Sequence, residues 1–223
     1  VLGHDLRPSS PHIAAACIQA IKAEGKSVIF AGELPTPAIA FYAGLRQYPA
    51  IIITGSHIPF DRNGIKFYRS SGEISKQDEK TILSQVPEFP DQIELEALPD
   101  VDPAIAECYL KRYWDAFGHD FLKGQRIAIY EHSSVSRDVL NVLFSGMGAE
   151  IISLGRTDQF VPIDTEAVRP EDILQAREWA KSYDFDILVS TDGDGDRPLI
   201  SDEKGNWLRG DMVGILCAQF LQA

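Results

Sequence analysis

Short apolar runs alternate with amphipathic segments along this chain, and no other feature limits its fold as much. Six runs have the length and composition of buried strands: residues 27–30, 50–53, 65–68, 126–130, 150–154 and 186–189. Between them, start and stop signals predict helices over residues 11–24, 104–117, 133–147 and 170–181. Strands that alternate with helices predict an α/β fold, in which helices cover a mixed, largely parallel sheet.

Residue types at the ends of two segments support the predicted helices. Ser9 and Ser10 are candidate N-caps, with Pro11 in the first turn, and Gly25 stands where this helix would end. Gly148 stands in the same place after residues 133–147. Both helices therefore have a predicted C-terminal stop.

Residues 86–103, VPEFPDQIELEALPDVDP, interrupt the alternation with four prolines and a cluster of acids. Proline removes a backbone donor and fits poorly inside helices and strands, so we interpret this segment as a connection between two domains. The predicted fold class is therefore α/β, with two consecutive three-layer domains over residues 1–90 and 91–203.

Composition and charge narrow the classes of function. A chain of 223 residues that is 44% hydrophobic can bury a sizeable core. Its formal charge of −12 would repel the phosphates of nucleic acid and of anionic membranes, so neither is an expected partner. Any phosphate group that the protein handles must be bound in a local pocket.

Cysteine use and hydropathy bear on location. The three cysteines, Cys17, Cys108 and Cys217, are too scattered for a disulfide framework and form no C-x-x-C pair, which favours the reducing cytoplasm. No apolar run reaches the roughly 20 residues of a membrane span, and no signal peptide is recognisable. Because the chain begins at Val1 inside apparent structure, we expect a processed or partial chain.

The motif STDGDGDRPLI, residues 190–200, follows an apolar run at the expected carboxyl end of a strand, where α/β proteins usually build their sites. Asp192, Asp194 and Asp196 alternate with glycines, so an extended backbone points all three carboxylates to one side. At about 4 Å, each pair would repel by roughly 4 kcal/mol at an effective dielectric of about 20. Such an all-oxygen cluster of ligands favours Mg²⁺ or Ca²⁺ as the bound cation.

Other interpretations of this loop are open at this point. A D-G-D-G run is also typical of a solvated acidic turn. An EF-hand is nearly matched, since Glu203 is the twelfth residue from Asp192, but Arg197 occupies the glycine position and the flanks resemble strands. A Mg²⁺-dependent phosphatase would use an aspartate of the loop as its nucleophile. The Arg197 guanidinium could contact a phosphate or simply neutralise the aspartates.

The sequence TGSHIPFDRNGIK, residues 54–66, follows another apolar run and lacks the G-x-S-x-G pattern of a serine hydrolase. Ser56 and His57 are neighbours in the chain, and adjacent side chains seldom have the geometry of a catalytic pair. Lys66, on the next predicted strand, would supply a cation within reach of the serine. The loop therefore indicates a polar site whose chemistry depends on the residues beside it.

Taken together, the separated motifs of the chain resemble the α-D-phosphohexomutase superfamily, the phosphoglucomutases and phosphomannomutases. T-G-S-H-I-P with N-G-I-K is similar to its phosphoserine loop, and D-G-D-G-D-R to its metal loop, in the same order. GHDLRPSSP resembles a motif of the family's first domain, and GNWLRGD the start of its third. The resemblance implies a four-domain architecture: residues 1–90 would be the first domain without its N-terminal strand, 91–203 the second, and 204–223 the truncated start of a third.

The resemblance also implies a role for each candidate residue. The metal ligands for Mg²⁺ would be Ser56, Asp192, Asp194 and Asp196. The catalytic residues would be Ser56 as the phosphorylated carrier, Lys66 as general acid/base and His57 in support. The substrate contacts would be Arg197 and Arg7.

The implied reaction moves a phosphoryl group between the 1- and 6-positions of a hexose phosphate, glucose or mannose. It would pass through the phosphoserine and a hexose 1,6-bisphosphate. Ile58 and His4 depart from the family's usual asparagine and arginine. Without third and fourth domains, this part is expected to bind metal but to turn over substrate poorly. The alternative is a non-catalytic metal-binding or regulatory relative, and no sequence feature indicates an oligomeric state.

Overall fold

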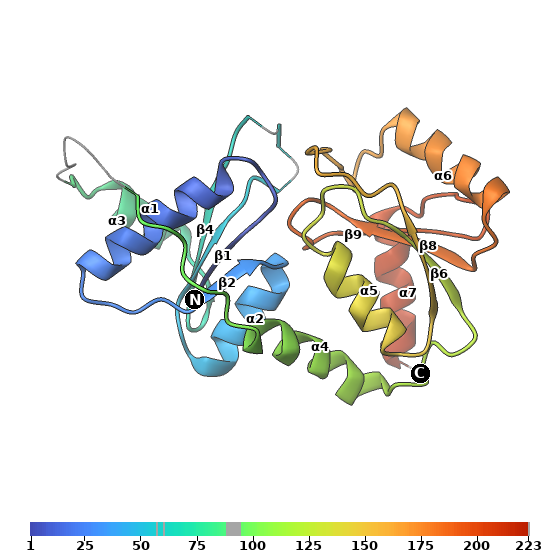
Figure 1. The fold of residues 1–223 in the computed structure, drawn as a ribbon, viewed down its shortest axis with the longest axis horizontal. Coiled ribbons are helices and arrows are strands. Elements are labelled where there is room, and N and C mark those ends of the chain that lie inside the picture. Colours follow the sequence, from blue (N-terminus) through green and yellow to red (C-terminus); the bar gives the residue numbers. More distant parts are fainter. Residues whose placement is uncertain (57, 60, 88–94, 223) are drawn as a thin grey trace.

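The computed structural model describes residues 1–56, 58–59, 61–87 and 95–222. Figure 1 shows two α/β units, one formed by the blue to green part of the chain and the other by the yellow to red part. Each unit contains one sheet with helices packed on it. Two α/β units with mixed, largely parallel sheets confirm the predicted fold class.

The first sheet has five strands in the order β2-β1-β3-β4-β5. They are β1 (Leu2–His4), β2 (Phe30–Glu33), β3 (Ala50–Ile53), β4 (Ile65–Arg69) and β5 (Gly72–Glu73). The helices of this unit are α1 (Ser10–Ala23), α2 (Thr36–Arg46) and α3 (Lys76–Leu83). Strand β1 is parallel to β2 and β3, whereas β4 and β5 pair in antiparallel fashion. The three parallel strands therefore end at the same edge of the sheet.

The second sheet has four strands in the order β7-β6-β8-β9. They are β6 (Arg126–Tyr130), β7 (Glu150–Leu154), β8 (Ile187–Thr191) and β9 (Pro198–Ser201). Its helices are α5 (Arg137–Ser145) and α6 (Pro170–Ser182), and α7 (Gly210–Gln222) follows β9 in the segment predicted to start a third domain. Strand β6 is parallel to β7 and β8, and β9 returns antiparallel to β8. The loop between β8 and β9 is the one that holds the three aspartates.

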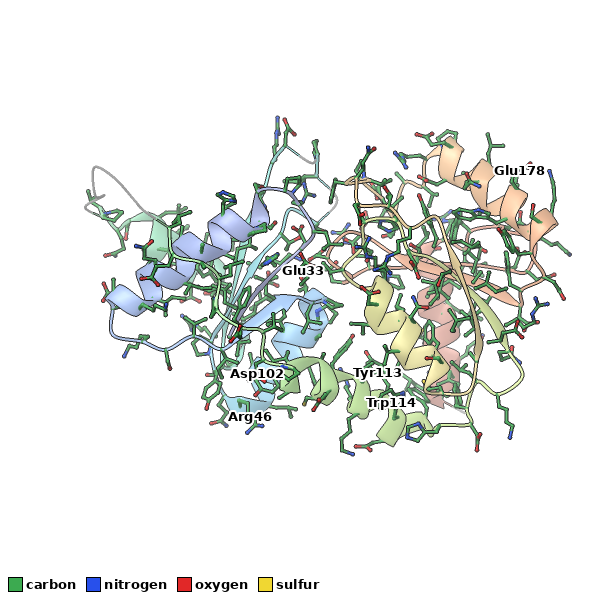
Figure 2. The ribbon with its side chains drawn as sticks, in the orientation of Figure 1. Glu33, Arg46, Asp102, Tyr113, Trp114 and Glu178 are labelled. Atoms are coloured by element: carbon green, nitrogen blue, oxygen red, sulfur yellow. The ribbon has the colours of Figure 1, made fainter. Side chains whose placement is uncertain are left out.

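Helix α4 (Ala104–Phe117) packs on both units. Near its start, Ile105 is fully buried with the core of the first unit, and further along Leu110 packs in a cluster shared by α2 and α5. Figure 2 labels Tyr113 and Trp114 near the far end of this helix, and the Trp114 ring donates a hydrogen bond to the Leu143 carbonyl at 3.2 Å. Burying each such apolar side chain stabilises the fold by about 1.5–3 kcal/mol.

The predicted strand over residues 27–30 is wrong in position, because β2 begins only at Phe30. Its neighbour β1 is three residues long and starts at Leu2, which pairs with Phe30, so the preceding apolar residues have no ladder to join. Those residues, Val28 and Ile29, pack instead in the cores of the unit. Strands β1, β5 and β9 were not predicted, because no sequence signal for them was strong enough.

The helix predicted over residues 104–117 is confirmed, and that over 170–181 ends one residue later. The first helix starts at Ser10, and Ser9 is its N-cap but makes no side-chain capping bond. The helix predicted over 133–147 is wrong at its start, since α5 begins at Arg137. Here the Ser133 hydroxyl accepts from the Val161 N–H, and the Ser134 hydroxyl bonds to Thr191 of β8 and to the N–H of Ser136, so these side chains hold a loop instead of starting a helix. Helices α2, α3 and α7 were not predicted.

The segment interpreted as a connection, residues 86–103, falls partly outside the described residues. At its end, Asp102 donates its backbone N–H to the Phe30 carbonyl at 2.8 Å and leads directly into α4. In the part of the chain that the structure describes, no helix combines the length and apolar character needed to cross a membrane.

Candidate active site

The serine loop leaves β3 and turns sharply at Ser56, which has a φ of 48°. This left-handed conformation is uncommon for a residue other than glycine. The backbone N–H of Ser56 bonds to the Thr54 hydroxyl at 2.8 Å. The Ser56 hydroxyl donates to Oδ2 of Asp192 at 2.8 Å, across 136 residues of sequence. The structure therefore brings the two predicted loops into direct contact.

Arg7 lies under the serine loop and not in the cleft where a substrate contact was expected. Its side chain is fully buried, and Nε pairs with Oδ2 of Asp5 at 3.1 Å. Its four remaining N–H groups point to backbone carbonyls of the loop, at residues 56, 58, 59 and 62, over 2.6–2.9 Å. All five guanidinium donors are thus used within the protein, and none is left for a substrate phosphate.

Asp5 is the acceptor that ties this loop to the start of α1. It follows β1 and is buried, with one oxygen accepting from the Ser10 hydroxyl at 2.5 Å and the other from the Thr54 hydroxyl at 2.8 Å. Since its charge is compensated by Arg7, the pair is a fully hydrogen-bonded buried ion pair. The GHDLRPSSP motif therefore serves the shape of the serine loop.

The three aspartates follow β8, and one carboxylate oxygen from each lies within 4.8 Å of the others. Asp192 and Asp194 are buried, and Asp196 is 29% exposed. The loop joins two antiparallel strands, so the EF-hand interpretation is wrong. Oδ1 of Asp194 is buried and accepts no hydrogen bond from the described residues. A buried anionic oxygen without a donor fits a cation ligand.

Lys66 lies on β4 and its ammonium group bonds to Asp194 at 2.8 Å and to Asp196 at 2.7 Å. Burial alone would lower the pKa of Lys66, but these two carboxylates raise it above its ordinary value. Lys66 is therefore protonated in this arrangement. The ammonium group that the sequence placed near Ser56 thus contacts the metal loop of the other unit.

Thr36, at the start of α2, is a site residue that sequence reasoning missed. Its hydroxyl donates to Oδ2 of Asp194 at 2.6 Å, and its backbone N–H donates to the Asp194 carbonyl at 2.9 Å. Burial alone would raise the pKa of Asp194, yet bonds from Lys66 and Thr36 hold it below its ordinary value. The only available signal was a Pro-Thr-Pro run opening a helix, which is common in proteins without a site.

Asp192 has the opposite shift. Burial and the charge of Asp194 raise the pKa of Asp192 to about 7, against smaller contributions from Ser56 and the Arg197 backbone. Two carboxylates in one buried site cannot both ionise cheaply without a cation. An all-oxygen donor set of this kind fits Mg²⁺, with Asp192, Asp194, Asp196 and Ser56 as the residues that would hold it.

A second missed group is the loop after β6, residues 131–136, whose side chains are all buried. The Val135 N–H bonds to the Gly193 carbonyl at 3.1 Å, and the Ser134 hydroxyl pairs with Thr191 at 2.7 Å. His132 also contacts Thr191, with Nε2 2.9 Å from the carbonyl, and its Nδ1 has no partner among the described residues. Through these contacts, this loop holds the backbone of the metal loop at Thr191 and Gly193.

The remaining predicted residues are not all placed in the site. Arg197 is 37% exposed and pairs with Glu166 at 3.1 Å, while its backbone N–H reaches Asp192 at 3.3 Å. It therefore borders the aspartate cluster, and its guanidinium contacts both Glu166 and Asp196, the latter at 3.9 Å from Nε to Oδ1. His57 lies outside the described residues.

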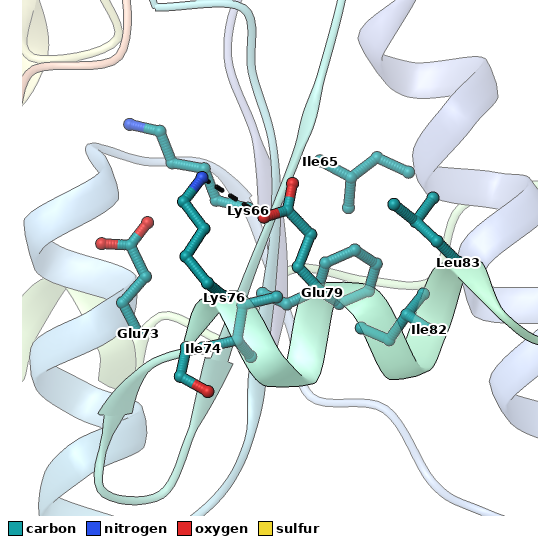
Figure 3. A pocket seen from close by; sticks show the side chains of 10 residues that line it. Ile65, Lys66, Glu73, Ile74, Lys76, Glu79, Ile82 and Leu83 are labelled. Carbon is teal, nitrogen blue, oxygen red and sulfur yellow. Dashed lines mark hydrogen bonds and ion pairs between the residues drawn. The ribbon is translucent and has the colours of Figure 1, made fainter.

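A cavity of about 570 Å³ lies beside this site, between the β4–β5 hairpin and α3. Figure 3 shows apolar residues Ile82 and Leu83 of α3 along it, and Lys76 paired with Glu79 at 3.4 Å. The ammonium group of Lys66 is bonded to the aspartates instead. This cavity therefore separates α3 from the sheet and is not the place where the charged groups converge.

Family models match two parts of the chain: Phosphoglucomutase/phosphomannomutase, alpha/beta/alpha domain I, over residues 1–91, and domain II over residues 109–205. A phosphomannomutase of Salmonella muenchen is 51% identical over 222 residues, covering 100% of this chain and 46% of that protein. A phosphomannomutase of Sinorhizobium fredii is 41% identical and is covered to 48%. The chain thus spans about half the length of the curated relatives it matches.

Solved structures show the same fold at lower identity. A phosphoglucomutase/phosphomannomutase family protein of Burkholderia thailandensis aligns with a TM-score of 0.78 at 23% identity, covering 99% of this chain and 50% of that one. A structure described as a putative phosphomannomutase, from Thermus thermophilus, gives 0.75 at 20% identity, covering 92% and 48%. At these identities the likeness concerns the fold.

Proposed function

This chain belongs to the phosphoglucomutase/phosphomannomutase family, and on that premise we propose that it is the phosphoserine and metal-loop part of a phosphohexomutase. The observation that carries the proposal is the 2.8 Å contact between the Ser56 hydroxyl and Asp192. A serine aimed at three carboxylates is suited to hold a phosphoryl group beside a divalent cation. The substrate is a hexose phosphate, and the relatives named phosphomannomutase favour the mannose form.

Ser56 is the carrier of the phosphoryl group. In the first half-reaction a sugar hydroxyl bonds to phosphorus while the bond from Ser56 Oγ to phosphorus breaks, which gives a hexose 1,6-bisphosphate. The reverse transfer, from the other position of the sugar, returns a phosphoryl group to Ser56. Its fixed left-handed backbone and the hydrogen bond from its own N–H to the Thr54 hydroxyl keep the oxygen directed at the metal loop.

Lys66 is the general acid/base of the transfer. It is protonated and 25% exposed, so it can give a proton to Ser56 Oγ as the bond to phosphorus breaks and regain one from the attacking hydroxyl. Arg197 lies at the border of the same cluster, where releasing Glu166 would free its guanidinium for a phosphate. His57, the neighbour of Ser56, is proposed as a supporting polar residue.

Mg²⁺ held by Asp192, Asp194, Asp196 and Ser56 would neutralise charge on the transferring phosphoryl group. A phosphoserine adds about −1.5 to −2 charge and would otherwise be repelled by the three aspartates. Thr36 and Lys66 position two of these carboxylates before any ligand arrives.

The first test is Ser56→Ala in the longest natural form of the protein, with Ser71→Ala as a matched control at an exposed turn. We expect peptide mass spectrometry to find phosphate on Ser56 in the parent and in Ser71→Ala. Mutase activity with Mg²⁺ should fall at least about 10³-fold in Ser56→Ala, because no carrier remains. Phosphatase activity that is retained in Ser56→Ala and lost in Asp192→Asn would point to an aspartyl phosphatase instead.

A further inference from the structure

One contact joins Arg7, which holds the serine loop of the first unit, to the second unit without involving the carboxylates. The Arg7 guanidinium lies 4.4 Å from the centre of the Phe160 ring, a distance at which a cation and an aromatic face attract. Phe160 belongs to the segment after β7 of the second sheet, whereas Arg7 follows β1 of the first sheet. The N–H groups at the edges of Arg7 are occupied by Asp5 and by the carbonyls of the serine loop, and the ring lies on one face of the guanidinium.

The Phe160 segment is fixed to the loop that supports the metal loop. The Val161 N–H bonds to the Ser133 hydroxyl at 2.8 Å, and Thr157 bonds to the His132 carbonyl at 3.3 Å. That loop in turn holds Gly193 through Val135. Phe160 is therefore anchored to the metal-loop unit by its neighbours in the chain.

The Phe160 ring also borders the metal loop directly. A Cβ placed on Gly193 would lie 3.5 Å from the ring and 3.4 Å from the Ser56 carbonyl. The ring and the serine loop thus approach the same point of the metal-loop backbone. The Ser56 carbonyl is itself bonded to Arg7 at 2.9 Å, which fixes the left-handed turn of that residue.

We propose that Arg7 and Phe160 are positioning residues that set the separation of Ser56 from the metal loop. Arg7 fixes the shape of the serine loop through its carbonyls, and Phe160 holds that assembly against the second unit. The two residues act through Ser56 and touch neither substrate nor metal. This inference rests on the proposed function only in naming Ser56 as the group to be positioned.

The test compares Phe160→Leu, which keeps an apolar side chain without a ring, with Phe160→Tyr, which keeps the ring. Phe160 is half-buried in a loop, so neither change threatens folding. Hydrogen exchange is measured at the Ile58 and Arg62 amides, both bonded within the serine loop. We expect Phe160→Leu to speed their exchange about 2- to 30-fold, and Phe160→Tyr to stay within about 2-fold of the parent.

Arg7→Lys is the second variant, because lysine keeps the charge but cannot reach four carbonyls. It should speed exchange at the same amides while the β6 amides stay unchanged. Parent-like exchange in Phe160→Leu, equal effects of leucine and tyrosine, or an equal change throughout β6 would each overturn the proposal. None of these readouts needs mutase activity, so a failed function test and a failed positioning test are distinguishable.

Discussion

At the scale of single residues, the site is shaped by groups that never need to meet a substrate. Ser56 adopts a left-handed turn that costs about 1–2 kcal/mol for a residue with a Cβ. Arg7 compensates by bonding to the carbonyls of residues 56, 58, 59 and 62. The glycine before the serine is part of the same arrangement, since its neighbours leave no room for a side chain.

Gly55→Ala should therefore damage the serine loop. A Cβ on Gly55 would lie 2.7 Å from Cζ of Arg7 and 2.9 Å from the Ile58 side chain, so loop or guanidinium must move. We expect a loss of about 1–3 kcal/mol in the free energy of unfolding, measured by urea denaturation. Gly44→Ala in α2 meets nothing within 4 Å and should stabilise by up to about 1 kcal/mol. Equal effects at both positions would contradict this account.

His132 should make stability depend on pH. Burial lowers the pKa of His132 from 6.5 to about 4, against a smaller contribution from the Thr191 carbonyl that raises it. As pH falls, His132 therefore binds a proton in the unfolded chain at a higher pH than in the folded one. The contribution of neutral His132 to the free energy of unfolding is fully present above pH 6.5. It is lost as pH falls toward 4, by up to about 3 kcal/mol.

His132→Asn should flatten that part of the stability curve, and asparagine tolerates the positive φ of 25° at this position. His12→Asn, on the exposed face of α1, is the control and should keep the slope. Thermal unfolding at a series of pH values measures both. An unchanged slope in His132→Asn would show that other groups cause it.

At the scale of helices and strands, the site forms where parallel strands end. The loops after β1, β2 and β3 bring Arg7, Thr36 and Ser56 to one edge, and those after β6 and β8 supply the opposite side. Helix α3 is different, because it has no buried residue and lies across the cavity from β4. It is held mainly by local contacts: a capping box between Ser75 and Asp78, and an ion pair from Arg69 to Asp78.

Ser75→Ala should therefore loosen α3 alone. Losing the cap costs about 1 kcal/mol, and Ser75→Thr should retain most of it. We expect faster hydrogen exchange in α3 and little change in the global unfolding midpoint, because the helix contributes little to the core. A lower midpoint with unchanged α3 exchange would mean that this helix unfolds only with the whole unit.

At the scale of the whole molecule, two sheets are held together by polar contacts at the site and by apolar contacts along α4. Leu110 of α4 packs with Ala38 of α2 and with Val139 and Leu143 of α5. This cluster shares side chains from both units, so it couples their unfolding. The polar contacts between Ser56 and Asp192 depend on that coupling for their geometry.

Leu110→Ala should separate the unfolding of the two units. The substitution removes about 2–5 kcal/mol from the shared cluster, whereas Leu174→Ala, at a side chain 61% exposed, should change stability by at most about 0.5 kcal/mol. Trp179 and Trp207 lie in the second unit and Trp114 in the shared cluster, so fluorescence in a Trp114→Phe background reports unfolding of the second unit, and hydrogen exchange of β3 reports the first. Midpoints that still coincide in Leu110→Ala would place the coupling elsewhere.

The sequence by itself determined the α/β class, helix α4, and the two loops whose residue types bear the chemistry. These features are local: apolar periodicity, Pro and Gly placement, and aspartates that alternate with glycine leave their signal within a few residues. Short strands such as β1 depend on neighbours for pairing and left no comparable signal.

Only the tertiary structure decided which residues meet. The contacts of Thr36 and Lys66 with Asp194 span 158 and 128 residues, and no local pattern encodes them. Arg7 was expected in the cleft because the family resemblance implies a substrate contact there, but burial and five internal acceptors assign its guanidinium to the serine loop. Partners, burial and therefore pKa depend on how two sheets pack, which follows from the whole core and not from any one motif.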